Sequence, residues 1–157
     1  MNKKLIVLIL FIFLLLSTVV ISIFGKKPDP PVVHVEEIVF VAGEGDKTEV
    51  NEEGLFVVII NIDELEETQG KYVIKYQLNY ILNPENAANK IVRFNVENPD
   101  QKDLVTFTST GLVTIELSSK VSTDITVIVT SADDASRASA KMIIRLEAKQ
   151  IEDMPTL

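Results

Sequence analysis

An uncharged run of 20 residues near the amino terminus, Leu5 to Phe24, constrains this chain more than any other feature. Seventeen of these residues are apolar, and only Ser17, Thr18 and Ser22 interrupt the run. At about 1.5 Å per residue, a helix of this length spans roughly 30 Å, the thickness of the hydrocarbon core of a bilayer. Because the run is apolar on every side, it does not fit a helix that covers a soluble core. It predicts a transmembrane helix over residues 5–25.

Lysines flank this segment on both sides, at Lys3, Lys4, Lys26 and Lys27. The positive-inside rule therefore decides the orientation only weakly, and the short amino-terminal flank favours residues 1–4 in the cytoplasm. The chain would then be a single-pass protein of the cell membrane with its carboxyl-terminal part outside. A cleaved signal peptide is the alternative, although the run exceeds the usual 7–15 apolar residues and Val20–Ser22 is a poor cleavage site.

Proline dominates the segment after the apolar run, with Pro28, Pro30 and Pro31 inside residues 26–34. Since proline fixes φ and lacks an N–H group, this segment is expected to be a stiff, extended linker. His34 ends the linker and is expected to be simply solvated. At the other end of the chain, residues 148–157 are predicted to be a flexible tail.

Charge divides the chain into two unlike parts. Residues 1–27 carry four lysines and no acid, whereas residues 28–157 carry 11 basic and 23 acidic residues, a net charge of −12. An acidic surface argues against a nucleic-acid partner, which needs clustered Lys and Arg. The absence of cysteine excludes disulfides and thiolate sites, and a single histidine disfavours catalysis or a metal site built on histidine. No catalytic residue, cofactor or metal is therefore predicted.

Residues 35–147 alternate between apolar and polar side chains, as half-buried β-strands do. The longest alternation runs from Tyr72 to Leu82 and predicts one strand. Further strands are expected at 35–42, 55–60, 92–96, 104–107, 113–117, 125–129 and 142–146. Turn residues such as Gln69-Gly70, Asn83-Pro84 and Thr110-Gly111 separate them. Seven or eight short strands at this spacing favour an all-β fold of the β-sandwich type.

Three motifs in this region agree in order and spacing with a known family. They are the Pro-Glu-Asn-Ala-Ala-Asn-Lys turn from Pro84 to Lys90, the Asn-Pro-Asp turn from Asn98 to Asp100, and the Gly-Leu-Val-Thr step from Gly111 to Thr114. Residues 76–146 thereby resemble the bacterial immunoglobulin-like group 2 domain of the intimin and invasin type, and residues 35–75 do so weakly. The chain departs from the family at Phe94, Thr123 and Ala135, where Trp, Gly and Gly are usual, and in its longer 46–71 segment.

The resemblance implies an immunoglobulin-like (Ig-like) sandwich over residues 35–147 behind the membrane anchor. It also implies a non-catalytic module for cell-surface binding, adhesion or spacing, with an extracellular protein or polysaccharide as partner. Docking to another membrane or envelope protein, and secretion after cleavage, stay open as alternatives. The residues expected to define the fold are Pro84, Ala87, Phe94, Pro99, Val105, Gly111, Val113, Ile125 and Val127.

Two features are candidates for binding. Tyr72, Tyr76 and Tyr80 share one face of the predicted strand; core packing is the favoured interpretation, but an exposed row would make an adhesive patch. The acidic stretch from Asp63 to Glu67, with Glu49, Glu52 and Glu53 near it in sequence, could bind Ca²⁺ or could simply be a solvated loop. Its spacing matches no EF-hand loop.

Overall fold

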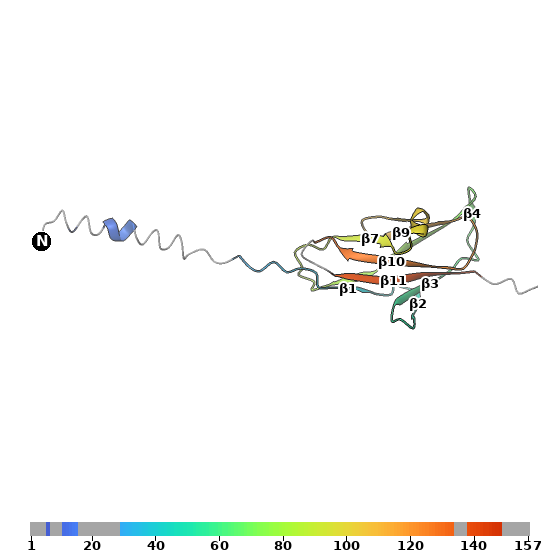
Figure 1. Cartoon of the computed structure of the whole chain (residues 1–157), viewed down its shortest axis with the longest axis horizontal. Helices are drawn as coiled ribbons and strands as arrows, with labels where there is room; N and C mark the ends of the chain where they lie inside the picture. Colours follow the sequence, from blue (N-terminus) through green and yellow to red (C-terminus); the bar gives the residue numbers. More distant parts are fainter. Residues whose placement is uncertain (1–5, 7–10, 16–28, 134–137, 149–157) are drawn as a thin grey trace, which may run out of the picture. The chain divides into compact units, whose positions relative to one another are not determined.

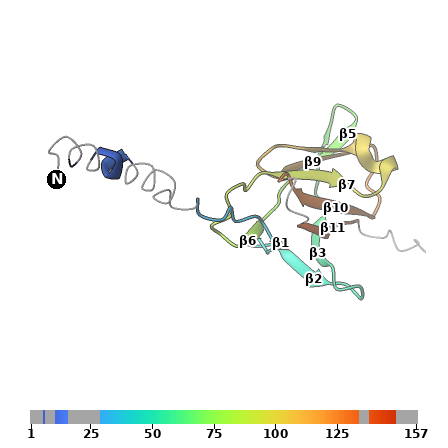
Figure 2. The same ribbon diagram turned by 60° about the vertical axis from the view of Figure 1, so that its left-hand side comes forward.

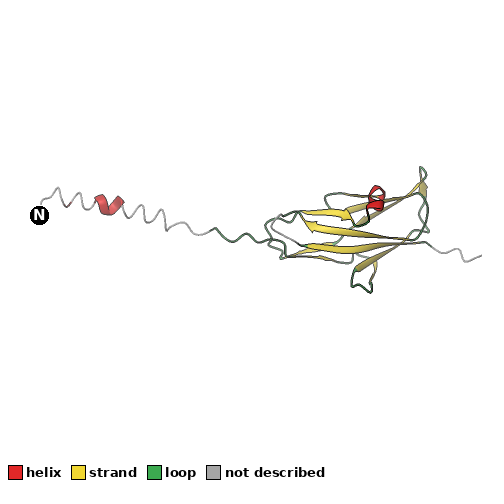
Figure 3. Ribbon diagram, in the orientation of Figure 1, coloured by secondary structure: helices red, strands yellow, loops and turns green. Residues whose placement is uncertain are grey.

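The computed structural model describes residues 6, 11–15, 29–133 and 138–148. The chain divides into two units, Met1–Pro31 and Val32–Leu157. In the first unit, residues 11–15 are helical and their apolar side chains are exposed (Figure 3). Among the described residues, no helix is long and apolar enough to cross a membrane. Most of the predicted transmembrane segment 5–25 lies outside the described residues, as do Ala135 and residues 149–157 of the predicted tail.

The larger sheet of the second unit has five strands, in the order β2-β3-β11-β10-β7 (Figure 1). These strands are β2 (Lys47–Val50), β3 (Phe56–Asn61), β7 (Val92–Val96), β10 (Thr123–Ser131) and β11 (Ser139–Glu147). β3 and β11 are parallel, and every other pair of neighbours is antiparallel. The apolar β3 is an inner strand, with β2 on one side and β11 on the other.

The second sheet has four strands, in the order β4-β5-β9-β8. They are β4 (Glu67–Thr68), β5 (Lys71–Gln77), β8 (Val105–Phe107) and β9 (Leu112–Leu117). A 3₁₀ helix, η1 (Pro99–Leu104), leads from β7 to β8, and the side chain of Asn98 caps it by accepting from the Asp100 N–H. β1 (Glu37–Phe40) and β6 (Tyr80–Asn83) pair separately as a two-stranded ribbon (Figure 2).

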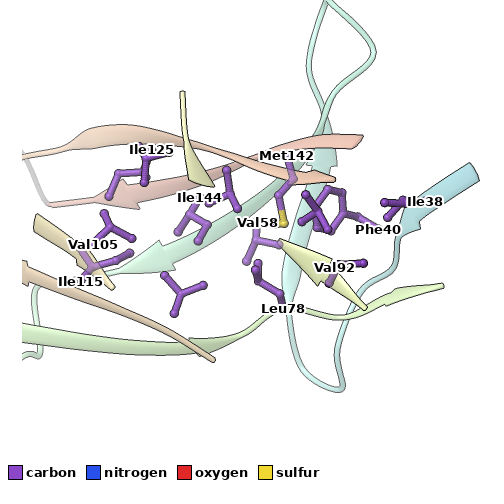
Figure 4. Packing of buried hydrophobic residues seen from close by; sticks show 14 of the residues in the cluster. Ile38, Phe40, Val58, Leu78, Val92, Val105, Ile115, Ile125, Met142 and Ile144 are labelled. Carbon is purple, nitrogen blue, oxygen red and sulfur yellow. The ribbon is translucent and has the colours of Figure 1, made fainter. Parts of the chain in front are cut away.

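One apolar cluster joins the sheets. Its buried side chains come from β3, β7, β10 and β11 of the larger sheet, from β5, β8 and β9 of the smaller one, and from the ribbon. Figure 4 labels ten of them, among them Val58 of β3 and Val92 of β7. Ile125, Val127 and Ile144 are fully buried in it, and each such side chain contributes about 1.5–3 kcal/mol to folding. Since both sheets bury their inner faces in one core, the mostly β domain is arranged as a β-sandwich. No charged or polar residue of the described part is buried.

The number of strands differs from the prediction of seven or eight, because the described residues contain eleven. Two of the additional strands, β2 and β4, are exposed along their whole length, so they show no alternation that a sequence pattern could reveal. β2 extends the larger sheet within the 46–71 segment that the sequence marks as unusually long.

The third additional strand arises because the predicted strand from Tyr72 to Leu82 is two strands. β5 ends at Gln77, whose side-chain amide donates to the Thr110 carbonyl at 2.9 Å. β9, the partner of β5, begins at Leu112, and the Leu78 N–H bonds to the Gly111 carbonyl just beyond it. The chain then leaves this sheet and pairs with β1 as β6. The alternation persists across the break, so the periodicity alone gives no sign of it.

The residues expected to define the fold lie at its core and its turns. Ala87, Val105, Val113, Ile125 and Val127 are buried, and Phe94 is half-buried against the same core. Phe94 packs between Tyr80, at a centroid distance of 5.9 Å, and Phe107, at 5.8 Å. Gly111 has a φ of +84°, a conformation that favours glycine. Pro84 follows β6, and Pro99 opens η1.

The second unit begins earlier than the predicted domain boundary at residue 35. The Ala88 N–H bonds to the Val33 carbonyl at 2.8 Å, and Val35 is buried in the core. The expectation that His34 is simply solvated is wrong, since its Nδ1 lies 2.6 Å from an Asp133 carboxylate oxygen. The carboxyl-terminal end of the predicted linker 26–34 is thereby tied to the domain.

Candidate functional site

The hydroxyl of Tyr76 forms a hydrogen bond within the domain. Its side chain is half-buried on the inner face of β5, and its hydroxyl donates to Asp46 Oδ2 at 2.6 Å. The same carboxylate oxygen accepts from the Gly43 N–H at 2.7 Å, so Asp46 fastens the loop before β2 to β5. Burial and then the hydrogen bond to Asp46 raise the pKa of Tyr76 above its ordinary value.

The two other tyrosines of the row also pack against the core. Tyr72 is half-buried, and the Lys120 ammonium lies 5.2 Å from the centroid of its ring. Tyr80 belongs to β6, meets Phe94 edge to face, and has a pKa raised by burial. The three side chains therefore form no exposed row, and core packing, the favoured interpretation, describes them.

A lysine from elsewhere in the chain, Lys120, lies beside the start of the acidic stretch from Asp63 to Glu67. Lys120 Nζ donates to the Asp63 carbonyl at 2.5 Å while it covers the ring of Tyr72. Glu49, one of the acids near this stretch in sequence, bonds instead to Arg145 across the larger sheet. Among the described residues, no group of three or more His, Asp or Glu side chains could hold a metal ion.

Arg145 organises the outer face of the larger sheet. From near the carboxyl-terminal end of β11 it donates to Asp124 on β10, with Nε at 3.1 Å from Oδ1, and to Glu49 on β2. Its side chain is 30 % exposed, and those of both acids are nearly half exposed. A shallow hollow lies beside this group, between Ile143 and the loop from Asn51 to Glu53. The ion pairs join the edge strand β2 to the middle of the sheet.

A second hollow, which we call the notch, lies where the chain leaves the smaller sheet after β5 and continues into β6. Its lining is formed by Leu78, Asn79, Tyr80, Ile81, Leu82, Glu85, Lys90 and Thr110. The turn before β9 forms one side of the notch through Thr110. In this turn the Gly111 N–H bonds to the Thr108 carbonyl at 3.1 Å. β9 begins at Leu112, opposite the last residue of β5, and does not extend alongside β6. In the described part, no strand therefore pairs with the edge of β6 that faces away from β1. The notch can bind a ligand through main-chain groups as well as side chains.

Sequence reasoning missed the notch because it depends on a break that the alternation hides. Two signals mark the place. Asn79, a poor strand former, interrupts a run of apolar and aromatic residues, and Asn83-Pro84 ends the run a few residues later. The partner that stops short, β9, can be identified only from the fold.

Comparisons with protein families and with curated proteins gave no match. No protein-family model matches the chain, and no curated protein matches it either.

Proposed function

We propose that residues 35–147 form an Ig-like domain similar to the bacterial group 2 family. An Ig sandwich pairs its strands A, B, E and D in one sheet and C, F and G in the other. Here β5, β9 and β8 pair in the order expected of B, E and D, while β7, β10 and β11 pair in the order expected of C, F and G. β1 lies beside β6, the continuation of β5, as A lies beside B. β2, β3 and the two-residue β4 are additions to this plan.

We further propose that this domain is tethered outside the cell by residues 5–25 and acts there in binding, adhesion or spacing without catalysis. The observation that carries the proposal is the uncharged, bilayer-length run directly before the β-sandwich. Phe11 and Phe13, in the described helical piece of that run, are 58 % and 74 % exposed, and contiguous exposed apolar side chains of this kind are typical of membrane or protein contact sites. The acidic domain, with its described charges outside the core, suits an aqueous location.

The anchor is tested by fractionating cells that produce the full chain. The proposal predicts that the protein stays in membranes washed with alkaline carbonate and keeps the mass of the whole chain, 17.5 kDa. A shorter protein in the medium would contradict the tether and favour the secreted alternative.

The accessory alternative is tested on the same membranes. Crosslinking followed by mild detergent extraction would recover one membrane protein in fixed proportion if the chain is a subunit of a larger assembly. Binding of the cell-bound chain to wall polymer or to host matrix, without such a companion, would support the surface-binding function.

A further inference from the structure

Most strand edges in the described part are protected against pairing with another chain. β4 and β8 have only two and three residues, and β2 carries charged side chains that keep such edges apart. β7 is longer, but the side chain of Asn95 accepts the Val96 N–H at 3.0 Å and so occupies a donor on that strand. β6 has none of these protections.

The main chain of β6 offers hydrogen-bonding groups to the notch. Residues of an antiparallel pair alternate between those that bond to the partner and those that point away. The Val41 N–H bonds to the Asn79 carbonyl at 3.0 Å, and the ladder continues through Val39 opposite Ile81. The N–H and C=O groups of Tyr80 and Leu82 therefore point away from β1, toward the side where the described part places no strand.

Apolar side chains lie beside these groups. Ile81 is 45 % exposed, and its cross-strand partner Val39 is 38 % exposed, so the outer face of the ribbon is apolar at its centre. On the inner side the ring of Tyr80 packs against Phe94 and is half-buried. An added strand would find apolar contacts on both of its faces.

The charge around the notch selects the occupant. The lining holds one exposed acid, Glu85, and one exposed base, Lys90, so the acidic excess comes from Glu36 and Glu37, which are exposed where β1 pairs with β6, and from the domain as a whole. Residues 28–157 carry −12 overall, so a basic segment would also be steered toward them. A second copy of this domain is acidic and would be repelled.

We propose that the notch binds an extended, basic segment of a partner protein, which adds to β6 as a further strand. Tyr80 and Leu82 supply the main-chain hydrogen bonds, Ile81 contacts the apolar side chains that share one face of the added strand, and Glu85 pairs with a Lys or Arg. The inference rests on the proposed binding function and names the class of partner. If the notch binds nothing while the chain is anchored at the cell surface, the spacer function stands and only this proposal fails.

The test uses the full chain in phosphatidylcholine nanodiscs and the probe peptide acetyl-Lys-Val-Lys-Val-Lys-Val-amide. Hydrogen exchange measured by NMR is expected to show the Tyr80 and Leu82 amides protected when the peptide is added. The substitutions Ile81→Lys and Glu85→Lys are expected to weaken binding at least tenfold. Val121→Lys, at an even more exposed apolar position in the loop before β10, is the matched control and should bind as the wild type does.

Several outcomes would overturn the proposal. A peptide with Glu in place of Lys that binds as tightly would refute the charge selection, and one with Pro in place of Val that binds as tightly would refute strand addition, since Pro lacks the N–H donor. Protection of β7 amides in place of those of β6 would show that the peptide binds at β7 and would refute binding in the notch. Protection without peptide would identify a second copy if it grows with protein concentration, and the lipid surface if it is lost when detergent replaces the nanodisc.

Discussion

Substitution of Gly111 by alanine is expected to destabilise the domain more than the same change at any open turn. Gly111 ends the turn between β8 and β9 with a φ of +84°, where an L-residue costs about 1–2 kcal/mol. A Cβ atom at this position would also meet Phe94 Cζ at 3.2 Å, closer than ordinary van der Waals contact. The effect of the substitution therefore has a conformational part and a packing part.

The packing part depends on how easily Phe94 can move. Its ring is stacked on Phe107, with an interplanar angle of 15°, and meets Tyr80 at 65°. Each aromatic pair contributes about 0.5–1.5 kcal/mol beyond burial, and overpacking of a core costs about 1–3 kcal/mol. We expect Gly111→Ala to lower the free energy of unfolding by about 2–5 kcal/mol in total.

Gly70→Ala is the matched control. Gly70 has a φ of +79° in the turn between β4 and β5, and a Cβ atom there meets nothing within 4 Å. This variant should lose only the conformational part, about 1–2 kcal/mol. The measurement is urea unfolding of the full chain in detergent, followed by the near-ultraviolet circular dichroism of its three tyrosines, which all lie in the domain.

A double variant identifies the neighbour responsible. Phe94→Leu, a smaller side chain, should recover part of the loss caused by Gly111→Ala, so that the two changes together cost less than their sum. Equal losses for Gly111→Ala and Gly70→Ala, or strictly additive effects with Phe94→Leu, would refute the contact between Gly111 and the aromatic cluster.

Three further predictions follow from the same contacts. The pKa of Tyr76 is raised in the folded state, so just above pH 10 its hydroxyl ionises only in the unfolded state. The free energy of unfolding contributed by Tyr76 is therefore complete below pH 10 and is lost as the pH rises. Tyr76→Phe should reduce this alkaline decline, and the control Tyr72→Phe should keep it. Arg145→Met should cost about 0.5–1 kcal/mol at low salt and less in 1 M NaCl, whereas Lys75→Met, at an exposed position of β5, should change little in either. The melting temperature should be the same in Ca²⁺ and in chelator, and an increase with Ca²⁺ would disclose a site that the described residues do not form.

Strands that bury one face were predictable from the sequence. The alternation of Ile125, Val127 and Val129 places them on one face, and the structure buries all three while half-exposing Thr126 and Ile128 between them. β2 was not predictable, since its four residues are exposed; it is placed by antiparallel pairing with β3 and by the contact of Glu49 with Arg145, 96 residues away.

The candidate site was harder to predict than the fold. The sequence placed the tyrosines on one face, but which side of the sheet was buried depends on the second sheet packing against it. The bond between His34 and Asp133 joins residues 99 apart, and no local pattern encodes it. The notch arises where β9 stops short of β6, which is a property of two strands and not of either segment alone.

Thiol labelling tests the tethered, outward-facing location most directly. The chain has no cysteine, so single substitutions report unambiguously on their surroundings. Ser109→Cys, in the exposed turn before β9, should react with a membrane-impermeant maleimide on intact cells, while Asn2→Cys should react only after lysis. Labelling of Asn2→Cys on intact cells, with Ser109→Cys protected until lysis, would contradict the account.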